Sequence, residues 1–197
     1  MKAQENKQKG GLINIAAFLP ASYSNGPGRR AVLWVQGCSR NCPGCFNQDM
    51  QGFQENQIVS VGEIVGRILA SEGIEGVTFS GGEPFGQAQA LAEVAEQVKE
   101  QGLNIVIFTG YTFAEFATEA NPAWQRLLAT ADLLIAGPYD QDLPAQDYLL
   151  GSANQQLVFL TDTLKQHPDV VNRQGQTMEV IVDAAGKVTV TGLAGKL

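Results

Sequence analysis

The stretch AVLWVQGCSRNCPGCFN, residues 31–47, places a short apolar run directly before a cluster of cysteines. Residues 31–35 are apolar and mostly β-branched or aromatic, which predicts a buried strand that ends in a tight turn. The three cysteines of the chain, Cys38, Cys42 and Cys45, follow with gaps of three and two residues. The first predicted strand therefore delivers all three thiols to one loop.

Strand and helix patterns alternate after this loop. Short apolar segments predict buried strands at residues 76–80, 104–108, 132–136 and 156–160. Apolar residues at helical spacing predict helices after Ser60, after Pro84 and after Thr112, the last running to about residue 129. Two further segments, 178–182 and 187–190, predict a hairpin. The alternation favours an α/β fold with a mostly parallel sheet covered on both faces.

The length of 197 residues favours one domain, and the composition, 44% hydrophobic and 17% charged, is that of a globular protein. The polar residues 1–11 are expected to form a disordered arm. Residues 12–197 are expected to form the domain, with a core at 12–160 and a C-terminal extension at 161–197. The hairpin falls within that extension.

The formal charge of −7 and the sequence pI of about 4.7 argue against a nucleic-acid partner, because no basic stripe is present. No run of about 18 apolar residues occurs, so no membrane partner is expected. The N-terminus lacks the apolar core of a signal peptide, which favours a cytoplasmic location.

Three cysteines within eight residues of a cytosolic chain indicate metal binding or catalysis before disulfide bonding. Thiolates are the ligands that iron–sulfur clusters favour, and three of them hold only three irons of a four-iron cluster. The fourth iron would keep an open position, as in catalytic zinc sites. Two alternatives are a zinc site completed by His167 and three unconnected structural cysteines.

A second motif, Gly81-Gly82-Glu83-Pro84, follows the strand predicted at 76–80. Glycines allow backbone to approach a ligand closely, and the Glu83 carboxylate can accept a charge-assisted hydrogen bond from an ammonium group. The alternative is an ordinary turn that starts a helix. Both motifs follow strands, at the sheet edge where parallel α/β folds bind ligands.

The two motifs together resemble those of the radical S-adenosylmethionine superfamily. The resemblance implies an incomplete (β/α) barrel and a 4Fe–4S cluster bound by Cys38, Cys42 and Cys45. It also implies that S-adenosylmethionine chelates the open iron and is cleaved by one electron to methionine and a 5′-deoxyadenosyl radical. The cofactor-binding residues that it implies are Gly44, Phe46, Gly81, Gly82, Glu83, Pro84 and Thr109.

Shorter motifs are similar to those of one branch, the activating enzymes of glycyl-radical enzymes. They are the segments NGPGRR at 25–30, CPGCFN at 42–47, TGY at 109–111, GP at 137–138 and GSANQ at 151–155. The resemblance implies a glycyl-radical enzyme, such as anaerobic ribonucleotide reductase, as protein substrate, and a flavodoxin or ferredoxin as electron donor. Asn25 and Arg30 are expected to face the substrate or partner, although the 25–30 segment also reads as a plain linker.

Two positions depart from the pattern of that branch: Ala136 stands where an Asp is usual, and Leu150 where an Arg is common. These departures keep open a radical enzyme that modifies a peptide or a small molecule. A non-catalytic iron–sulfur carrier is a third alternative, but a carrier normally closes its cluster with a fourth cysteine. The chain has no further cysteine, which excludes a second cluster.

Overall fold

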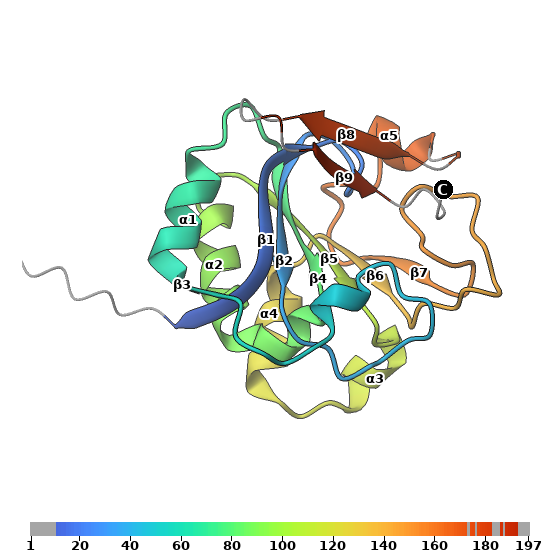
Figure 1. The fold of residues 1–197 in the computed structure, drawn as a ribbon, viewed down its shortest axis with the longest axis horizontal. Coiled ribbons are helices and arrows are strands. Elements are labelled where there is room, and N and C mark those ends of the chain that lie inside the picture. The colour runs from blue at the N-terminus through green and yellow to red at the C-terminus, as the bar shows by residue number, and fades with distance from the viewer. Residues whose placement is uncertain (1–10, 173, 176, 183–185, 187, 193–197) are drawn as a thin grey trace, which may run out of the picture.

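The computed structural model describes residues 11–172, 174–175, 177–182, 186 and 188–192 (Figure 1). The predicted N-terminal arm lies, except for Gly11, outside the described residues. No helix within the described part of the chain is long and apolar enough to cross a membrane.

One sheet of seven strands organises the fold, in the order β3-β1-β2-β4-β5-β6-β7. Its centre is parallel and consists of β2 (Arg30–Val35), β4 (Gly76–Gly81), β5 (Asn104–Thr109) and β6 (Leu133–Ala136). The sequence predicted all four of these strands. The central sheet is therefore mostly parallel, as expected.

The edges of the sheet are antiparallel. On one side β1 (Leu12–Ser22) pairs with β2, and β3 (Gln57–Ser60) pairs with β1; on the other, β7 (Gln156–Phe159) pairs with β6. The sequence analysis did not identify β1 or β3. The structure thus establishes a mixed α/β fold with a parallel centre, and the barrel form stays a prediction.

Helices cover one face of the sheet (Figure 1). They are α1 (Val61–Leu69), α2 (Ala88–Lys99) and α4 (Pro122–Thr130), and the shorter α3 (Phe113–Thr118) lies at the carboxyl end of β5. Ser60 caps α1 by accepting the backbone N–H of Glu63, and Thr112 and Glu115 form the complete capping box predicted for α3. Three further short helices are η1 (Gln48–Met50), η2 (Pro84–Gln87) and α5 (Pro168–Val171).

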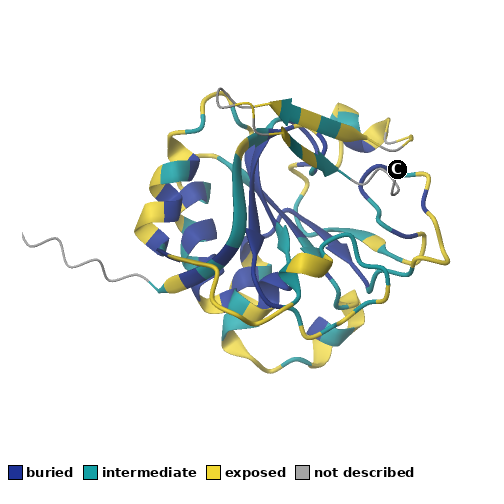
Figure 2. Ribbon diagram, in the orientation of Figure 1, coloured by how far each residue is buried: buried dark blue, intermediate teal, exposed yellow. Residues whose placement is uncertain are grey.

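Consecutive residues of the parallel strands are buried, and Figure 2 draws these strands mostly in dark blue. In β5, Ile105 and Ile107 pack toward the helices, whereas Val106 belongs to a second cluster on the other face. That second cluster also contains Leu164, from a segment that follows β7. The parallel strands are therefore continuously apolar because both faces of the sheet are covered, as the sequence predicted.

A separate two-stranded sheet, β8 (Met178–Val182) and β9 (Val188–Gly192), forms the C-terminal hairpin. The sequence analysis predicted both strands, and β9 extends two residues beyond its predicted end. Most of the turn predicted at 183–186 lies outside the described residues.

Arg30 is fully buried at the start of β2. Its Nε donates to Thr78 Oγ1 at 2.7 Å, one Nη donates to Asn104 Oδ1 at 2.7 Å, and the other donates to the carbonyl of Pro27. Burial lowers the pKa of Arg30 to about 10, so the side chain stays protonated at neutral pH. This network holds the 25–28 loop against the sheet, because the Thr78 hydroxyl also donates to the Asn25 carbonyl at 2.7 Å.

We expect Arg30→Met to lower the free energy of unfolding by about 3 kcal/mol, because it leaves several buried acceptors without a donor. Urea denaturation at neutral pH measures this loss. The matched control is Arg29→Met, since Arg29 is only partly buried and donates to the backbone carbonyl of Glu72 at the surface. The control should cost less than about 1 kcal/mol. Equal losses in the two variants would show that the buried network does not stabilise the fold.

Candidate functional site

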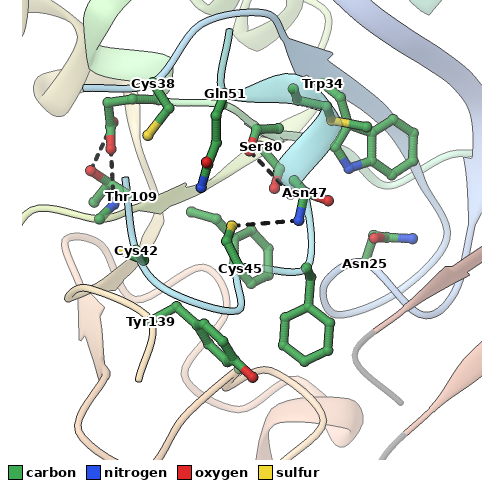
Figure 3. A pocket seen from close by; sticks show the side chains of 18 of the residues that line it. Asn25, Trp34, Cys38, Cys42, Cys45, Asn47, Gln51, Ser80, Thr109 and Tyr139 are labelled. Carbon is green, nitrogen blue, oxygen red and sulfur yellow. Dashed lines mark hydrogen bonds between the residues drawn. The ribbon is translucent and has the colours of Figure 1, made fainter. Parts of the chain in front are cut away.

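A cavity of about 320 Å³ lies at the carboxyl ends of the four parallel strands (Figure 3). The segments that follow β2, β4, β5 and β6 all contribute to its lining, and they include the three cysteines. This is the edge at which parallel α/β sheets bind their ligands.

The cysteine loop is fixed at its base by backbone hydrogen bonds to the segment that follows it. Gly37 N–H donates to the Met50 carbonyl at 2.8 Å, and Cys38 N–H donates to the Gln51 carbonyl at 2.9 Å. Gly37 and Gly44 adopt positive φ angles of 98° and 67°, which glycine permits and other residues rarely adopt. The loop therefore turns tightly enough to bring its thiols to one cavity.

Backbone amides within the loop donate to two of the sulfurs. Arg40 N–H donates to Cys38 Sγ and Asn47 N–H donates to Cys45 Sγ, each at 3.4 Å. Such hydrogen bonds stabilise thiolates over thiols. Burial raises the pKa of the Cys38 thiol, so without a bound cation this sulfur favours its protonated form.

The turn after β4 packs directly against the base of the cysteine loop. Gly82 N–H donates to the Val35 carbonyl at 2.8 Å, and Glu83 N–H donates to the Gly37 carbonyl at 2.9 Å. A Cβ atom at Gly82 would lie 2.2 Å from the Gly37 oxygen, and one at Gly81 would lie 2.5 Å from the Val35 nitrogen. Both glycines are therefore required by the approach of two backbone segments to each other, a reason that the sequence did not reveal.

Glu83 is a buried carboxylate at the wall of this cavity, with 2% of its surface exposed. It accepts hydrogen bonds from the backbone N–H of Phe85 at 3.0 Å, from the Thr109 hydroxyl at 2.9 Å and from the backbone N–H of Gly110 at 2.9 Å. Burial raises the pKa of Glu83 to about 7, although these three donors favour the ionised form. A cationic group in the cavity would stabilise the ionised form further.

Two observations fit a bound iron–sulfur cluster and its ligand in this cavity. The cysteines present three thiols, the donor set that such clusters favour. In addition, the side-chain Nε2 of Gln51 is buried at the cavity wall without a hydrogen-bond partner among the described residues, and Figure 3 shows its amide directed inward. Among the described residues, no three His, Cys, Asp or Glu side chains gather closely enough to hold a single metal ion.

Most of the predicted site residues line this one cavity. They are Asn25, Cys38, Cys42, Cys45, Phe46, Gly81, Gly82, Glu83 and Thr109. Gly44 and Pro84 are not part of the lining: Gly44 faces Gln141, and Pro84 is buried at the start of η2 with Glu83 as its N-cap. Their predicted roles, like those of the other residues, stay predictions.

Arg30 and His167 lie away from the cavity. Arg30 was expected to face the substrate or partner, but its guanidinium is held inside the protein by the network described above. His167 caps α5 by accepting the backbone N–H of Asp169, and its Nε2 lies 3.3 Å from Glu75 Oε2. Neither side chain is among those that line the cavity with the thiols.

The segments 137–138 and 151–155 contribute Gly137, Gly151 and Gln155 to one side of the cavity, which we call its floor. The Gln155 side chain accepts the Gly151 N–H at 2.9 Å and donates to the Gly137 carbonyl at 2.8 Å, so it joins the 137–138 and 151–155 segments. Phe46 packs on Tyr139 from this floor, with ring centroids 4.9 Å apart.

The two departures noted in the sequence have a packing explanation. Ala136 is 1% exposed in the main core, and Leu150 packs against the second cluster. A charged group in place of Ala136 would have to be buried, which is costly without a partner, and one in place of the half-buried Leu150 would lose its apolar packing on the second cluster.

The sequence analysis missed several residues that line the cavity. Arg40 lies 4.6 Å from the centroid of the Tyr111 ring and forms an ion pair with Glu115 at 3.2 Å. Gln51 has no motif around it, and the hairpin residues 189–192 come from a distant part of the chain. Only Arg40 carried a signal, since it stands between the first two cysteines.

A cavity lined by three thiols is the site expected of an iron–sulfur protein with one cluster. In agreement, the family described as "4Fe-4S single cluster domain" matches residues 24–158. Relatives named anaerobic ribonucleoside-triphosphate reductase-activating protein are similar over nearly their whole length. The protein of Vibrio cholerae is 31% identical over 154 residues, which cover 73% of this chain and 96% of that protein.

The protein of that name from Enterobacteria phage T4 is 29% identical over 161 residues, covering 79% of this chain and 99% of its own. The Escherichia coli K12 protein is 27% identical over 157 residues, covering 73% and 96%. This chain belongs to the family of anaerobic ribonucleoside-triphosphate reductase-activating proteins. Among solved structures, QueE from Escherichia coli is a weak match, with a TM-score of 0.38 at 18% identity over 51% of this chain and 53% of that one.

The raised pKa of Glu83 predicts a pH dependence of stability in the unliganded protein. The folded pKa of about 7 lies above the ordinary value of 4.5, so the protonated form stabilises the fold below about pH 4.5. That contribution, about 3 kcal/mol, is lost as the pH rises toward and through 7. Urea denaturation between pH 5 and pH 8 should show it as a falling free energy of unfolding, and Glu83→Gln should flatten the profile.

Glu63→Gln is the matched control, because Glu63 is an exposed carboxylate on α1. We expect this variant to keep the wild-type profile. A Glu83→Gln profile that runs parallel to the wild type would mean that Glu83 is not the group that titrates.

Proposed function

We propose that this chain binds a 4Fe–4S cluster and S-adenosylmethionine and generates a glycyl radical on a partner enzyme of the anaerobic ribonucleoside-triphosphate reductase type. The observation that carries the proposal is that three thiols and a buried carboxylate, Glu83, line the same cavity. The relatives named as activators of that reductase share almost their entire length with this chain.

When bound, the two groups together would supply one-electron cleavage of the sulfonium to methionine and a 5′-deoxyadenosyl radical, which would take a hydrogen atom from a glycine Cα and become 5′-deoxyadenosine. The electron comes from an external low-potential donor, a flavodoxin or ferredoxin. The sulfonium receives one electron and the glycine loses one hydrogen atom, so the unpaired electron remains on the glycine Cα. The cluster and S-adenosylmethionine would supply the radical chemistry. The protein would bind and orient these two groups and exclude water from them.

Cys38, Cys42 and Cys45 would each bind one iron. A fourth thiolate is absent from the chain, so one iron keeps a position for the amino and carboxylate groups of the cofactor's methionine moiety. The cysteine loop is anchored at its base, at Gly37 and Cys38, by backbone hydrogen bonds, and its three thiols would draw together around the cluster.

Glu83 would accept a hydrogen bond from the cofactor's ammonium group. Its carboxylate is held in place by Thr109 and by the Gly110 amide, so it needs no reorientation on binding. This assigns Thr109 a positioning role through Glu83. Gln51 Nε2, which has no hydrogen-bond partner in the part of the chain that the structure describes, would donate to a group bound in the cavity.

The protein substrate would present a glycine-bearing loop at the cavity. A cytoplasmic location fits this partner and an electron donor of the flavodoxin or ferredoxin type.

The proposal is tested under anaerobic conditions. The chain is reconstituted with iron and sulfide, reduced, and mixed with S-adenosylmethionine and the partner reductase. We expect 5′-deoxyadenosine by mass spectrometry and a glycyl-radical signal by electron paramagnetic resonance. Cys42→Ala should abolish both, with loss of cluster absorbance, because two thiols cannot hold the cluster in this geometry.

Ser39→Ala is the matched control, since Ser39 is exposed in the same loop. It should retain both products and the cluster. If the wild type forms its cluster but makes no 5′-deoxyadenosine with the partner present, the proposed function is wrong. If 5′-deoxyadenosine forms and no glycyl radical appears, the substrate is another peptide or small molecule.

A further inference from the structure

The C-terminal hairpin lies beyond the part of the chain that the family match covers, which ends at residue 158. The match to the phage T4 relative covers 99% of that protein but 79% of this chain. Figure 1 shows the hairpin, in red, beside the loop that joins β1 and β2. A segment outside the matched region therefore lies next to the predicted site.

The two faces of the hairpin differ. The cross-strand pairs Val180–Val190 and Val182–Val188 lie on one face, and their side chains are 56–63% exposed. Glu179 and Thr191 pair on the opposite face and are partly buried. The polar face is therefore the one that contacts the rest of the protein.

Glu179 fixes this face to the loop at residues 22–24. Its Oε2 accepts hydrogen bonds from the Ser22 hydroxyl, from the Tyr23 N–H at 3.0 Å, and from the Ser24 N–H and hydroxyl at 3.1 and 2.9 Å. Burial raises the pKa of Glu179, but these donors outweigh it and hold the pKa below its ordinary value. The contact is thus a charge-assisted one at neutral pH.

Thr191 makes a second attachment, to Asn25. Asn25 Nδ2 donates to Thr191 Oγ1 at 2.9 Å, and Thr191 Oγ1 lies 3.2 Å from Asn25 Oδ1. The Asn25 side chain is thereby engaged with the hairpin. Its backbone carbonyl is held from the other side by Thr78.

Residues 189–192 of β9 line the same cavity as the cysteines and Glu83. The hairpin thus provides one wall of the cavity, and two attachments to the 22–25 loop keep that wall in place. Gly192 closes against the start of β8, where an added Cβ would lie 2.3 Å from the Thr177 carbonyl oxygen.

We infer that the C-terminal hairpin is a specificity-determining wall of the reaction cavity, positioned by Glu179 and Thr191, that restricts the path by which the partner's glycine-bearing loop enters. This inference rests on the proposed function. Such a wall also limits the access of water and of other hydrogen donors to the reacting atoms. Glu179 acts through the hairpin, so it is a positioning residue and not a catalytic one.

Glu179→Ala tests the inference in the full chain. Hydrogen exchange should rise at residues 22–25 and 188–192, because the attachment is lost. The KM for the partner reductase should rise several-fold, because a loosened wall no longer guides the partner's loop along one path into the cavity. The cluster content should stay that of the wild type. The yield of 5′-deoxyadenosine per glycyl radical should also rise several-fold, because more hydrogen is taken from other donors.

Two further variants keep the test decisive. Thr191→Val removes the second attachment with little change of volume and should shift the same three quantities in the same direction. Val180→Thr is the matched control on the exposed face of the hairpin and should shift none of them.

The inference is overturned if hydrogen exchange rises in Glu179→Ala while the KM and the product ratio stay at wild-type values. It is also overturned if exchange does not rise, since Glu179 then does not hold the hairpin. A wild-type chain that makes no 5′-deoxyadenosine overturns the proposed function instead, and with it this inference.

Discussion

The site depends on one backbone contact, between the turn after β4 and the base of the cysteine loop after β2. Gly82 lies so close to the Gly37 carbonyl that no side chain fits between them, and two backbone hydrogen bonds join the segments. The parallel pairing of β2 and β4 ends at Val35 and Gly81, directly before this contact. The register of the sheet therefore fixes the distance between the thiols and Glu83.

The burial of the Glu83 carboxylate determines how this group can interact with a ligand in the cavity. A carboxylate inside the protein is costly, and the three donors around Glu83 offset only part of that cost. A cationic group bound beside Glu83 would offset the remainder. The Nε2 of Gln51, buried without a hydrogen-bond partner among the described residues, and the half-buried thiol of Cys38 line the same cavity as Glu83.

The sequence predicted the parallel centre of the sheet and the helices on it, because continuous apolar runs and helical periodicity are local properties. It did not predict β1, although residues 12–19 are mostly apolar, or β3, which has only four residues, two of them exposed, and no apolar run. Arg30 was expected to face outward from its position in a motif, but the acceptors that bury it, Thr78 and Asn104, come from neighbouring strands. The hairpin itself was predicted, whereas its attachment was not, because Glu179 and Ser22 are 157 residues apart.

That separation has a consequence for the order of assembly. Contacts between distant parts of a chain form late, because the intervening loop must first be closed. During synthesis, the sheet strands and the cysteine loop leave the ribosome well before residues 178–192. The hairpin side of the cavity is therefore the last to form, so a bulky group could enter from that side before β8 and β9 dock.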